Sequence, residues 1–189
     1  MYLSFQGAAP GSKFPMARDH HQTEELLERS GIPFAALRDN LYLDILPEMF
    51  GSAGVARGPA GDGAAAFVSR DDVARVAATA LSRPDVVRGA VDVTGPEALT
   101  LAEVARRLAA LAGRQLRYEN ESVATGRAWR AQLGAPAWEV DTWLGSYEAI
   151  AAGELAATSD AVARLTGRAP ESLESYFTRN PELLAALRP

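Results

Sequence analysis

Polar and ionisable side chains follow three apolar segments that have the character of buried strands. Residues 4–7 follow the first segment, residues 38–42 the second and residues 94–96 the third. In an open parallel sheet the carboxyl ends of the strands meet at one edge, and ligands bind in the crevice beyond it. We therefore expect these stretches to form a binding site, with hydroxyl and amide groups for hydrogen bonding and an arginine for an anion.

Two ionisable residues near this edge each have two interpretations. His20 lies on a predicted helix over residues 17–30 and can either reach a bound ligand or be a hydrogen-bonded core histidine. Arg38 can bind a phosphate or form a structural ion pair with Asp39 or Asp44. By i, i+4 and i+7 spacing, the inward stripe of the helix is predicted to contain Met16, His20, Thr23 and Leu27.

The hydrophobic pattern alternates between short strands and helices of about a dozen residues. Predicted strands cover residues 1–5, 33–38, 65–68, 91–94 and 115–119, and predicted helices cover residues 17–30, 69–81 and 100–113. Gly31 suits a left-handed helix end, and Thr100 with Glu103 forms a capping box. Beyond Gly113 the pattern is alanine-rich and mostly helical. This order predicts an α/β fold with a mainly parallel sheet.

Composition excludes several classes of function. The net charge of -5 gives nucleic acid no electrostatic foothold, and no apolar run approaches the roughly 18 residues that cross a bilayer. Without cysteine there is no disulfide or thiolate metal site, which fits a reducing cytoplasm. The two histidines are adjacent, so a histidine-rich metal site is not expected and no metal ligand is assigned.

A glycine pattern and a group of tryptophans have to be interpreted from the residues around them. Residues 61–66, GDGAAA, match the dinucleotide pattern G-x-G-x-x-A, but they lead into the apolar pair Phe67 and Val68 where the motif requires a helix. We predict a turn before a strand. The tryptophans can line an aromatic substrate pocket or form the core of a small helical region; they are Trp129, Trp138 and Trp143.

The sequence resembles the NmrA-like atypical short-chain dehydrogenases/reductases, close to their NAD(P)H:quinone oxidoreductase branch. The resemblance rests on LSFQGA at residues 3–8, ARDHHQTEELL at 17–27, SGIPF at 30–34, LRDNLY at 37–42, FVSRDDVA at 67–74 and VTGPEALT at 93–100. It extends to about residue 121 and fades across the C-terminal helices.

The resemblance implies part of an NAD(P)-binding Rossmann-like parallel sheet with helices, plus a smaller, mostly helical C-terminal region. Residues 1–100 would be the C-terminal half of the Rossmann domain, with an interleaved substrate-region segment, and residues 101–189 the mainly helical substrate region. The glycine-rich phosphate loop of the family would then lie about a hundred residues before residue 1. We accordingly expect weak dinucleotide binding, and self-association through the exposed edge of the first strand.

Lys13 is the only lysine among 19 basic residues, and Ala9 stands four residues before it. The Tyr-x-x-x-Lys pair that many short-chain dehydrogenases use for proton donation therefore cannot form. In the resemblance the place often held by that lysine falls on His20.

The resemblance implies NADP or NAD as the cofactor and a small-molecule acceptor such as a quinone. The implied cofactor-binding residues are Ser4, Phe5, His20, Arg38 and Asn40, and the implied substrate-binding residues are Gln6, Tyr42 and Trp129; none is assigned as catalytic. The leading expectation is an NAD(P)H-dependent oxidoreductase that reduces quinones or small carbonyl compounds. The alternatives are a non-catalytic dinucleotide sensor of the NmrA type and an inactive fragment.

Overall fold

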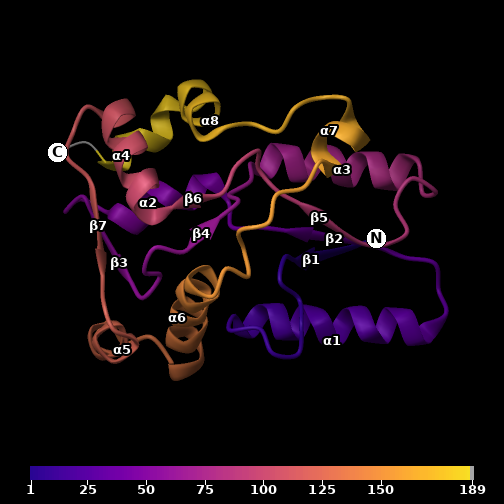
Figure 1. Cartoon of the computed structure of the whole chain (residues 1–189), viewed down its shortest axis with the longest axis horizontal. Coiled ribbons are helices and arrows are strands. Elements are labelled where there is room, and N and C mark those ends of the chain that lie inside the picture. Colours follow the sequence, from indigo (N-terminus) through magenta and orange to yellow (C-terminus); the bar gives the residue numbers. More distant parts are fainter. Residues whose placement is uncertain (188–189) are drawn as a thin grey trace.

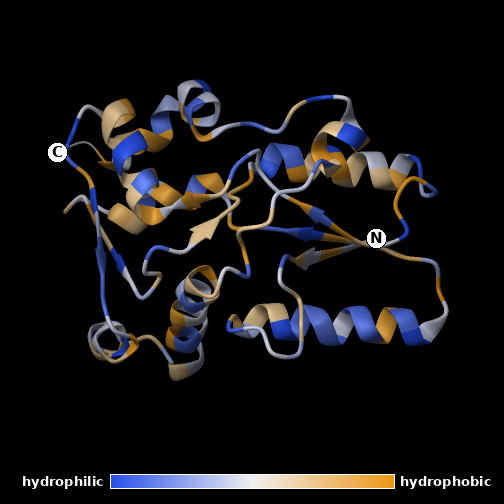
Figure 2. Cartoon of the chain, in the orientation of Figure 1, coloured by the Kyte–Doolittle hydropathy of each residue, from blue (hydrophilic) through white to orange (hydrophobic). Residues whose placement is uncertain are grey.

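A three-stranded parallel sheet forms the centre of the computed structural model, which describes residues 1–187 (Figure 1). Its strands β1 (Tyr2–Phe5), β2 (Ala35–Asp39) and β5 (Gly89–Val93) lie in the order β1-β2-β5. Their carboxyl ends share one edge, because all three run in the same direction. In Figure 2, β2 changes from hydrophobic to hydrophilic residues toward that end. The structure confirms the predicted α/β fold.

Helices cover both faces of this sheet. Helix α1 (Pro15–Ser30) crosses one face, and α3 (Arg70–Ser82) lies on the other with α7 (Ala161–Thr166) packed against it (Figure 1). The second face is closed by an apolar cluster that includes Leu37, Val76, Val93 and Val162. No helix within residues 1–187 is both long enough and apolar enough to span a membrane.

Helix α1 begins two residues earlier than predicted, at Pro15, whose fixed φ suits the first turn of a helix. It ends at Gly31, where the left-handed φ of +70° confirms the predicted end. The predicted inward stripe is correct for His20, Thr23 and Leu27, which are partly buried, and wrong for Met16. Met16 is exposed, and the buried residues of the helix are Ala17 and Glu24. The reason is electrostatic, because Glu24 turns inward to pair with an arginine on the sheet.

Segments from both sides of residue 100 build the second part of the molecule. Strand β3 (Val55–Gly58) pairs in parallel with β7 (Arg117–Asn120), and β4 (Ala64–Ala65) pairs antiparallel with β6 (Leu99–Thr100). The helical elements around them are η1 (Leu43–Ile45), α2 (Leu46–Phe50), α4 (Leu101–Ala112), α5 (Val123–Ala131), α6 (Ala137–Ala151), α8 (Leu173–Arg179) and η2 (Pro181–Leu187). Their apolar side chains form the larger core cluster.

The GDGAAA segment forms a turn that leads into β4, as predicted. Gly61 has a φ of +54°, a conformation that residues with a Cβ rarely adopt. Gly63 has no room for a side chain, because a Cβ there would collide with the backbone carbonyl of Ile150 on α6. The predicted strand over residues 65–68 is shorter than expected, and Val68 contributes an isolated bridge to Tyr42.

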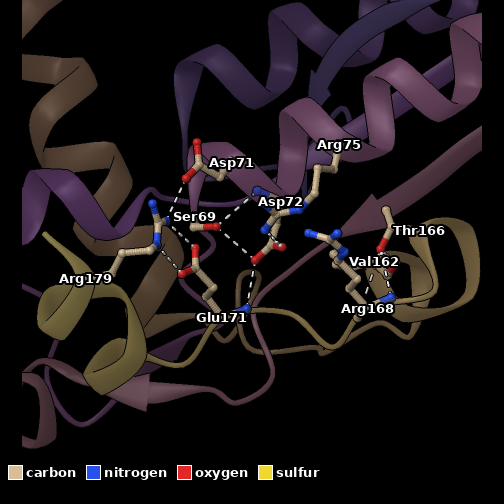
Figure 3. A network of polar contacts seen from close by, with 9 residues as sticks. All are labelled: Ser69, Asp71, Asp72, Arg75, Val162, Thr166, Arg168, Glu171 and Arg179. Atoms are coloured by element: carbon tan, nitrogen blue, oxygen red, sulfur yellow. Dashed lines mark hydrogen bonds and ion pairs between the residues drawn. The ribbon is translucent and has the colours of Figure 1, made fainter.

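A polar network joins the start of α3 to the loop before α8 (Figure 3). Ser69 caps α3 by accepting a hydrogen bond from the backbone N–H of Asp72 at 3.1 Å. The fully buried carboxylate of Asp72 accepts hydrogen bonds from the Ser69 hydroxyl at 2.9 Å and from the Glu171 backbone N–H at 2.8 Å. It also pairs with Arg75 at 2.6 Å. Asp72 therefore joins the start of α3 to the loop before α8.

We expect Asp72→Ala to lower the free energy of unfolding by about 2–3 kcal/mol, because the helix cap is weakened and buried donors lose their acceptor. Urea denaturation measures this. Asp71→Ala is the matched control, since the neighbouring Asp71 forms a half-exposed ion pair with Arg179 and should change stability by about 0.5 kcal/mol. Equal losses in the two variants would contradict the assigned role.

Candidate functional site

A cavity of about 230 Å³ opens at the carboxyl ends of β1 and β2, and we call it the sheet-edge cavity. It brings together five residues predicted from sequence: Ser4, Phe5, His20, Asn40 and Tyr42. Asp39, Leu41 and Ile45 also line it. The cavity thus lies at the predicted edge and includes residues from two of the three predicted stretches, but none from residues 94–96, and Asp39 was not predicted as a site residue.

Ser4 and Arg38 are engaged with helix α1. The register pairs them on neighbouring strands, and both contact the buried carboxylate of Glu24: the Ser4 hydroxyl donates at 2.5 Å and Arg38 donates through two nitrogens, Nε at 2.9 Å. Burial by itself would raise the pKa of Glu24, but the hydrogen bonds from Arg38 and Ser4 outweigh it and lower that pKa. Arg38 is thus in a structural ion pair, with Glu24 in place of the predicted Asp39 or Asp44.

Gln6 and Asn40 form a buried amide pair at the same edge. The Asn40 amide donates to the Gln6 side-chain oxygen at 2.5 Å and to the Leu155 carbonyl at 2.9 Å, and its oxygen accepts from the Leu41 N–H at 2.6 Å. Gln6 in turn donates to the Ala157 carbonyl at 2.8 Å. Gln6 lies outside the lining of the sheet-edge cavity. Its amide joins β1 and β2 to the segment after α6.

His20 is a hydrogen-bonded, partly buried histidine, which was one of its two interpretations from sequence. Its Nδ1 lies 2.7 Å from the hydroxyl of Tyr2, and its ring stacks with that of Phe5 at 6.5 Å between centroids. The same side chain lines the sheet-edge cavity. Burial lowers the pKa of His20 although the charges of Glu24 and Asp19 oppose this, so the imidazole is neutral at pH 7.

Asp39 and Tyr42 are hydrogen-bonded on the opposite face of β2. Successive side chains of a strand alternate between faces, so Asp39 points away from the α1 face that Arg38 occupies. The Tyr42 hydroxyl donates to the Asp39 carboxylate. Burial raises the pKa of Asp39 to about 6, although the hydrogen bond from Tyr42 and the charge of Arg70 partly oppose it. Burial, followed by the nearby carboxylate, also raises the pKa of Tyr42.

A second and larger cavity, of about 690 Å³, lies among α2, α5 and α6, and we call it the tryptophan cavity. Trp129, Trp143, Tyr147 and Met49 contribute to its mostly apolar wall. The sequence left pocket and core as alternatives for the tryptophans, and the structure places two of the three at the cavity. Trp138 is 69% exposed and lies outside the lining.

Arg130 holds the aromatic wall in place. Arg130 is 3% exposed, and its guanidinium lies 4.2 Å from the centroid of the Trp129 ring and pairs with Glu121 at 2.7 Å. Glu121 also accepts a hydrogen bond from the Trp129 indole N–H at 3.0 Å. The ring of Tyr147 packs directly on Gly58 of β3, where a Cβ would collide with it. Arg130 and Gly58 were not predicted, because neither contact is visible in local sequence.

The two cavities are neighbours, because Leu41 and Ile45 line both of them. These residues lie in the segment that leaves β2 and enters η1. Hydrogen bonds of 3.0 Å between this segment and Val68 hold it in place, one from the Leu43 N–H and one to the Leu41 carbonyl. Among residues 1–187 no group of three or more His, Cys, Asp or Glu side chains is placed to hold a metal ion.

Comparisons with known proteins agree with the α/β fold described above. No family model matches the chain. An NAD(P)H azoreductase from Xenophilus azovorans is 29% identical over 174 residues, 90% of this chain and 60% of that protein. An NmrA-like family domain-containing oxidoreductase from Aspergillus flavus is 26% identical over 174 residues, 89% of this chain and 56% of that protein.

Among solved structures, the NADPH complex of an NADPH-dependent quinone oxidoreductase from Escherichia coli superposes with a TM-score of 0.84 at 29% identity. The match covers 95% of this chain and 64% of that one. The fold is a Rossmann-like α/β architecture. The similar proteins include an NmrA-like family domain-containing oxidoreductase, which agrees with the resemblance that the sequence motifs indicated. The chain spans about 60% of the length of the curated relatives it matches.

The pKa of Asp39 makes the stability of the fold depend on pH. Because this pKa is raised in the folded state, the stability that the protonated carboxyl contributes is complete below its ordinary value, near pH 4, and is lost as the pH rises through about 6. We expect the free energy of unfolding of Asp39→Asn, relative to the natural chain, to increase by about 2–3 kcal/mol between pH 4 and pH 7.

Urea denaturation at several pH values measures this difference. Asp85→Asn, which removes an exposed carboxylate, is the control for the change of net charge. A difference between Asp39→Asn and the natural chain that stays constant from pH 4 to pH 7 would contradict the assigned burial of Asp39.

Proposed function

We propose that this chain carries the nicotinamide and acceptor sites of an NAD(P)H-dependent oxidoreductase that reduces quinones or small carbonyl compounds. The observation that supports it most is the common wall of Leu41 and Ile45 between the sheet-edge cavity and the tryptophan cavity. A hydride transfer requires two planar groups in adjacent sites, and this geometry provides two such sites. The similar proteins are named as reductases, so a non-catalytic sensor is not favoured.

The residues of the sheet-edge cavity fit a nicotinamide ring. Phe5, Phe14 and Leu41 give the cavity apolar surface, and Tyr42 and the neutral His20 add groups that can form hydrogen bonds. When bound there, a reduced nicotinamide would supply a hydride. Phe5 and Leu41 would exclude water from the ring, while His20 and Tyr42 would orient it. Ser4 and Asn40 would act indirectly, since their side chains are held by Glu24 and by Gln6.

The acceptor would bind in the tryptophan cavity. Planar aromatic compounds gain from stacking on aromatic side chains, and the wall presents Trp129, Trp143 and Tyr147. The charges of Arg57 and Arg130 at this wall are paired with Glu119 and Glu121. A neutral planar acceptor such as a quinone therefore fits this cavity better than a strongly charged one.

This chain offers a cavity for the nicotinamide ring of the dinucleotide but no comparable site for its phosphates. The one match to G-x-G-x-x-A, residues 61–66, leads into β4, so it offers no helix N-terminus to a pyrophosphate. We therefore propose that NADPH binds to the 189-residue chain with an affinity weaker than micromolar, which fluorescence titration measures. A micromolar dissociation constant would contradict this.

The activity is tested by following NADPH absorbance with menadione or benzoquinone, with NADPH at millimolar concentration. We expect a loss of absorbance that depends on both the protein and the quinone. Absence of quinone-dependent oxidation at every NADPH concentration would overturn the proposed function for this chain.

Trp129→Ala should raise the KM for the quinone about three- to tenfold, because one aromatic contact is lost, and should leave the KM for NADPH nearly unchanged. Trp138→Ala is the matched control, since Trp138 lies outside the cavity lining and should leave both constants unchanged. Steady-state kinetics measures both. An equal rise in the two variants would contradict binding of the acceptor at this wall.

Self-association and a cytoplasmic location also remain proposals. Within the described residues β1 pairs on one side, with β2, and its Leu3 is 44% exposed, so a second sheet edge could add there. Light scattering that shows a monomer at all concentrations would contradict self-association. The absence of cysteine supports a reducing compartment.

A further inference from the structure

Asp39 and Tyr42 line the sheet-edge cavity on either side of Leu41, which lines both cavities, and the proposed function gives them no part in proton transfer. We propose that they form a proton-donating pair, in which the Tyr42 hydroxyl delivers a proton to the acceptor oxygen and the buried Asp39 carboxyl replaces it. The inference rests on the proposed function, because it concerns the proton that accompanies hydride transfer to a quinone or carbonyl.

The reaction needs such a donor. A hydride carries two electrons and one proton to the acceptor, and the product keeps one negatively charged oxygen until a second proton arrives. The Tyr-x-x-x-Lys arrangement cannot supply it here, because Lys13 is the only lysine and no tyrosine stands four residues before it. Tyr42 is the tyrosine that lines the sheet-edge cavity, three residues after the end of β2.

The geometry makes Asp39 and Tyr42 a pair. Asp39 is 5% exposed and lines the same cavity, and its carboxylate accepts the Tyr42 hydroxyl hydrogen bond. The Arg70 guanidinium stands 3.9 Å above the centre of the Tyr42 ring and is held by Asp44 through a hydrogen bond of 2.7 Å. The phenol is thus fixed between the start of α3 and the end of β2, with its oxygen at the carboxyl.

The acid strengths suit a relay. The raised pKa of Asp39, about 6, keeps a fraction of this carboxyl protonated near neutral pH, whereas an ordinary aspartate would be almost fully ionised. The raised pKa of Tyr42 means that its ionised form is unstable and is quickly protonated again by the neighbouring carboxyl. Asp39 therefore acts as the proton source and Tyr42 as the group that reaches the acceptor.

Proton transfer to the acceptor follows hydride transfer. The hydride from the reduced nicotinamide leaves the acceptor with a negatively charged oxygen. The step starts from the protonated Asp39 carboxyl, whose O–H donates to the Tyr42 oxygen, the reverse of the hydrogen bond that the ionised carboxylate accepts. The Tyr42 O–H bond then breaks as the acceptor O–H bond forms, and the Asp39 O–H bond breaks as the Tyr42 hydroxyl is restored. Solvent then protonates the Asp39 carboxylate, and no other oxidant or reductant is required.

Other ionisable groups face the pair from the surrounding elements. They are His20 on α1, Arg70 at the start of α3 and Asp44 on η1. Burial lowers the pKa of His20, and the hydrogen bond to Asp44 raises that of Arg70. The pH profile of Asp39→Asn separates the contribution of Asp39 from that of His20.

The test compares Tyr42→Phe and Asp39→Asn with the natural chain in NADPH-dependent quinone reduction from pH 5.5 to pH 8. In the natural chain kcat should fall as the pH rises above about 6. In both variants kcat should be about 100-fold lower and independent of pH, with the KM for the quinone within about threefold. Tyr176→Phe is the matched control, because this core tyrosine on α8 lies outside both cavities and should keep the natural pH profile.

A second readout does not depend on activity. Carbon NMR of the Asp39 carboxyl, assigned by its disappearance in Asp39→Asn, should show a titration midpoint near pH 6 that rises further in Tyr42→Phe, because the hydrogen bond that stabilises the carboxylate is lost. A midpoint unaffected by Tyr42→Phe would overturn the pair. A Tyr42→Phe variant that keeps the natural kcat and pH profile would also overturn the proposed pair. A natural chain without activity at every pH would overturn the proposed function instead.

Discussion

The buried amide pair of Gln6 and Asn40 is the contact on which the arrangement of the site depends. Both side chains are almost inaccessible to water, so each of their polar atoms needs a partner inside the protein. They find these partners in each other, in the Leu41 N–H and in the carbonyls of Leu155 and Ala157. Removing either amide would leave buried groups unpaired, at about 1–3 kcal/mol each.

This pair sets where the chain goes after β2. Because Asn40 accepts from Leu41, the chain turns out of the sheet at that point, and Leu41 and Ile45 come to lie between the two cavities. The same pair connects the sheet to the segment after α6, and α6 supplies Trp143 and Tyr147 to the tryptophan cavity. The proposed nicotinamide and acceptor sites are thus positioned by one set of hydrogen bonds.

The two carboxylates nearest to the site behave in opposite ways because β2 separates them. Glu24, on the α1 side, receives hydrogen bonds from Arg38 and Ser4, which lower its pKa despite burial. Asp39, on the other side, accepts from the Tyr42 hydroxyl, and this is too weak to compensate for the loss of water. One strand therefore carries both a structural ion pair and a carboxyl suited to exchange protons near neutral pH.

Sequence by itself determined the three strands of the central sheet, most of the helices, and the edge of the sheet at which the candidate site lies, but it missed β3. The capping box at Thr100 and the glycine at residue 31 are local interactions, so they predicted the ends of their helices well. The rule for parallel strands brought Ser4, Asn40 and Tyr42 to one cavity. Sequence also excluded the Tyr-x-x-x-Lys pair, since that depends on residue types alone.

The tertiary structure decided which polar side chains are already engaged and which face open space. Periodicity predicted Met16 on the buried face of α1, but the buried residue is Glu24, since its partner Arg38 lies 14 residues away on a strand. The hydrogen bonds of Gln6 to residue 157 and the contact of Arg130 with Arg57 join still more distant segments. Local propensity carries no information about such pairs, because they form only when packing brings the segments together.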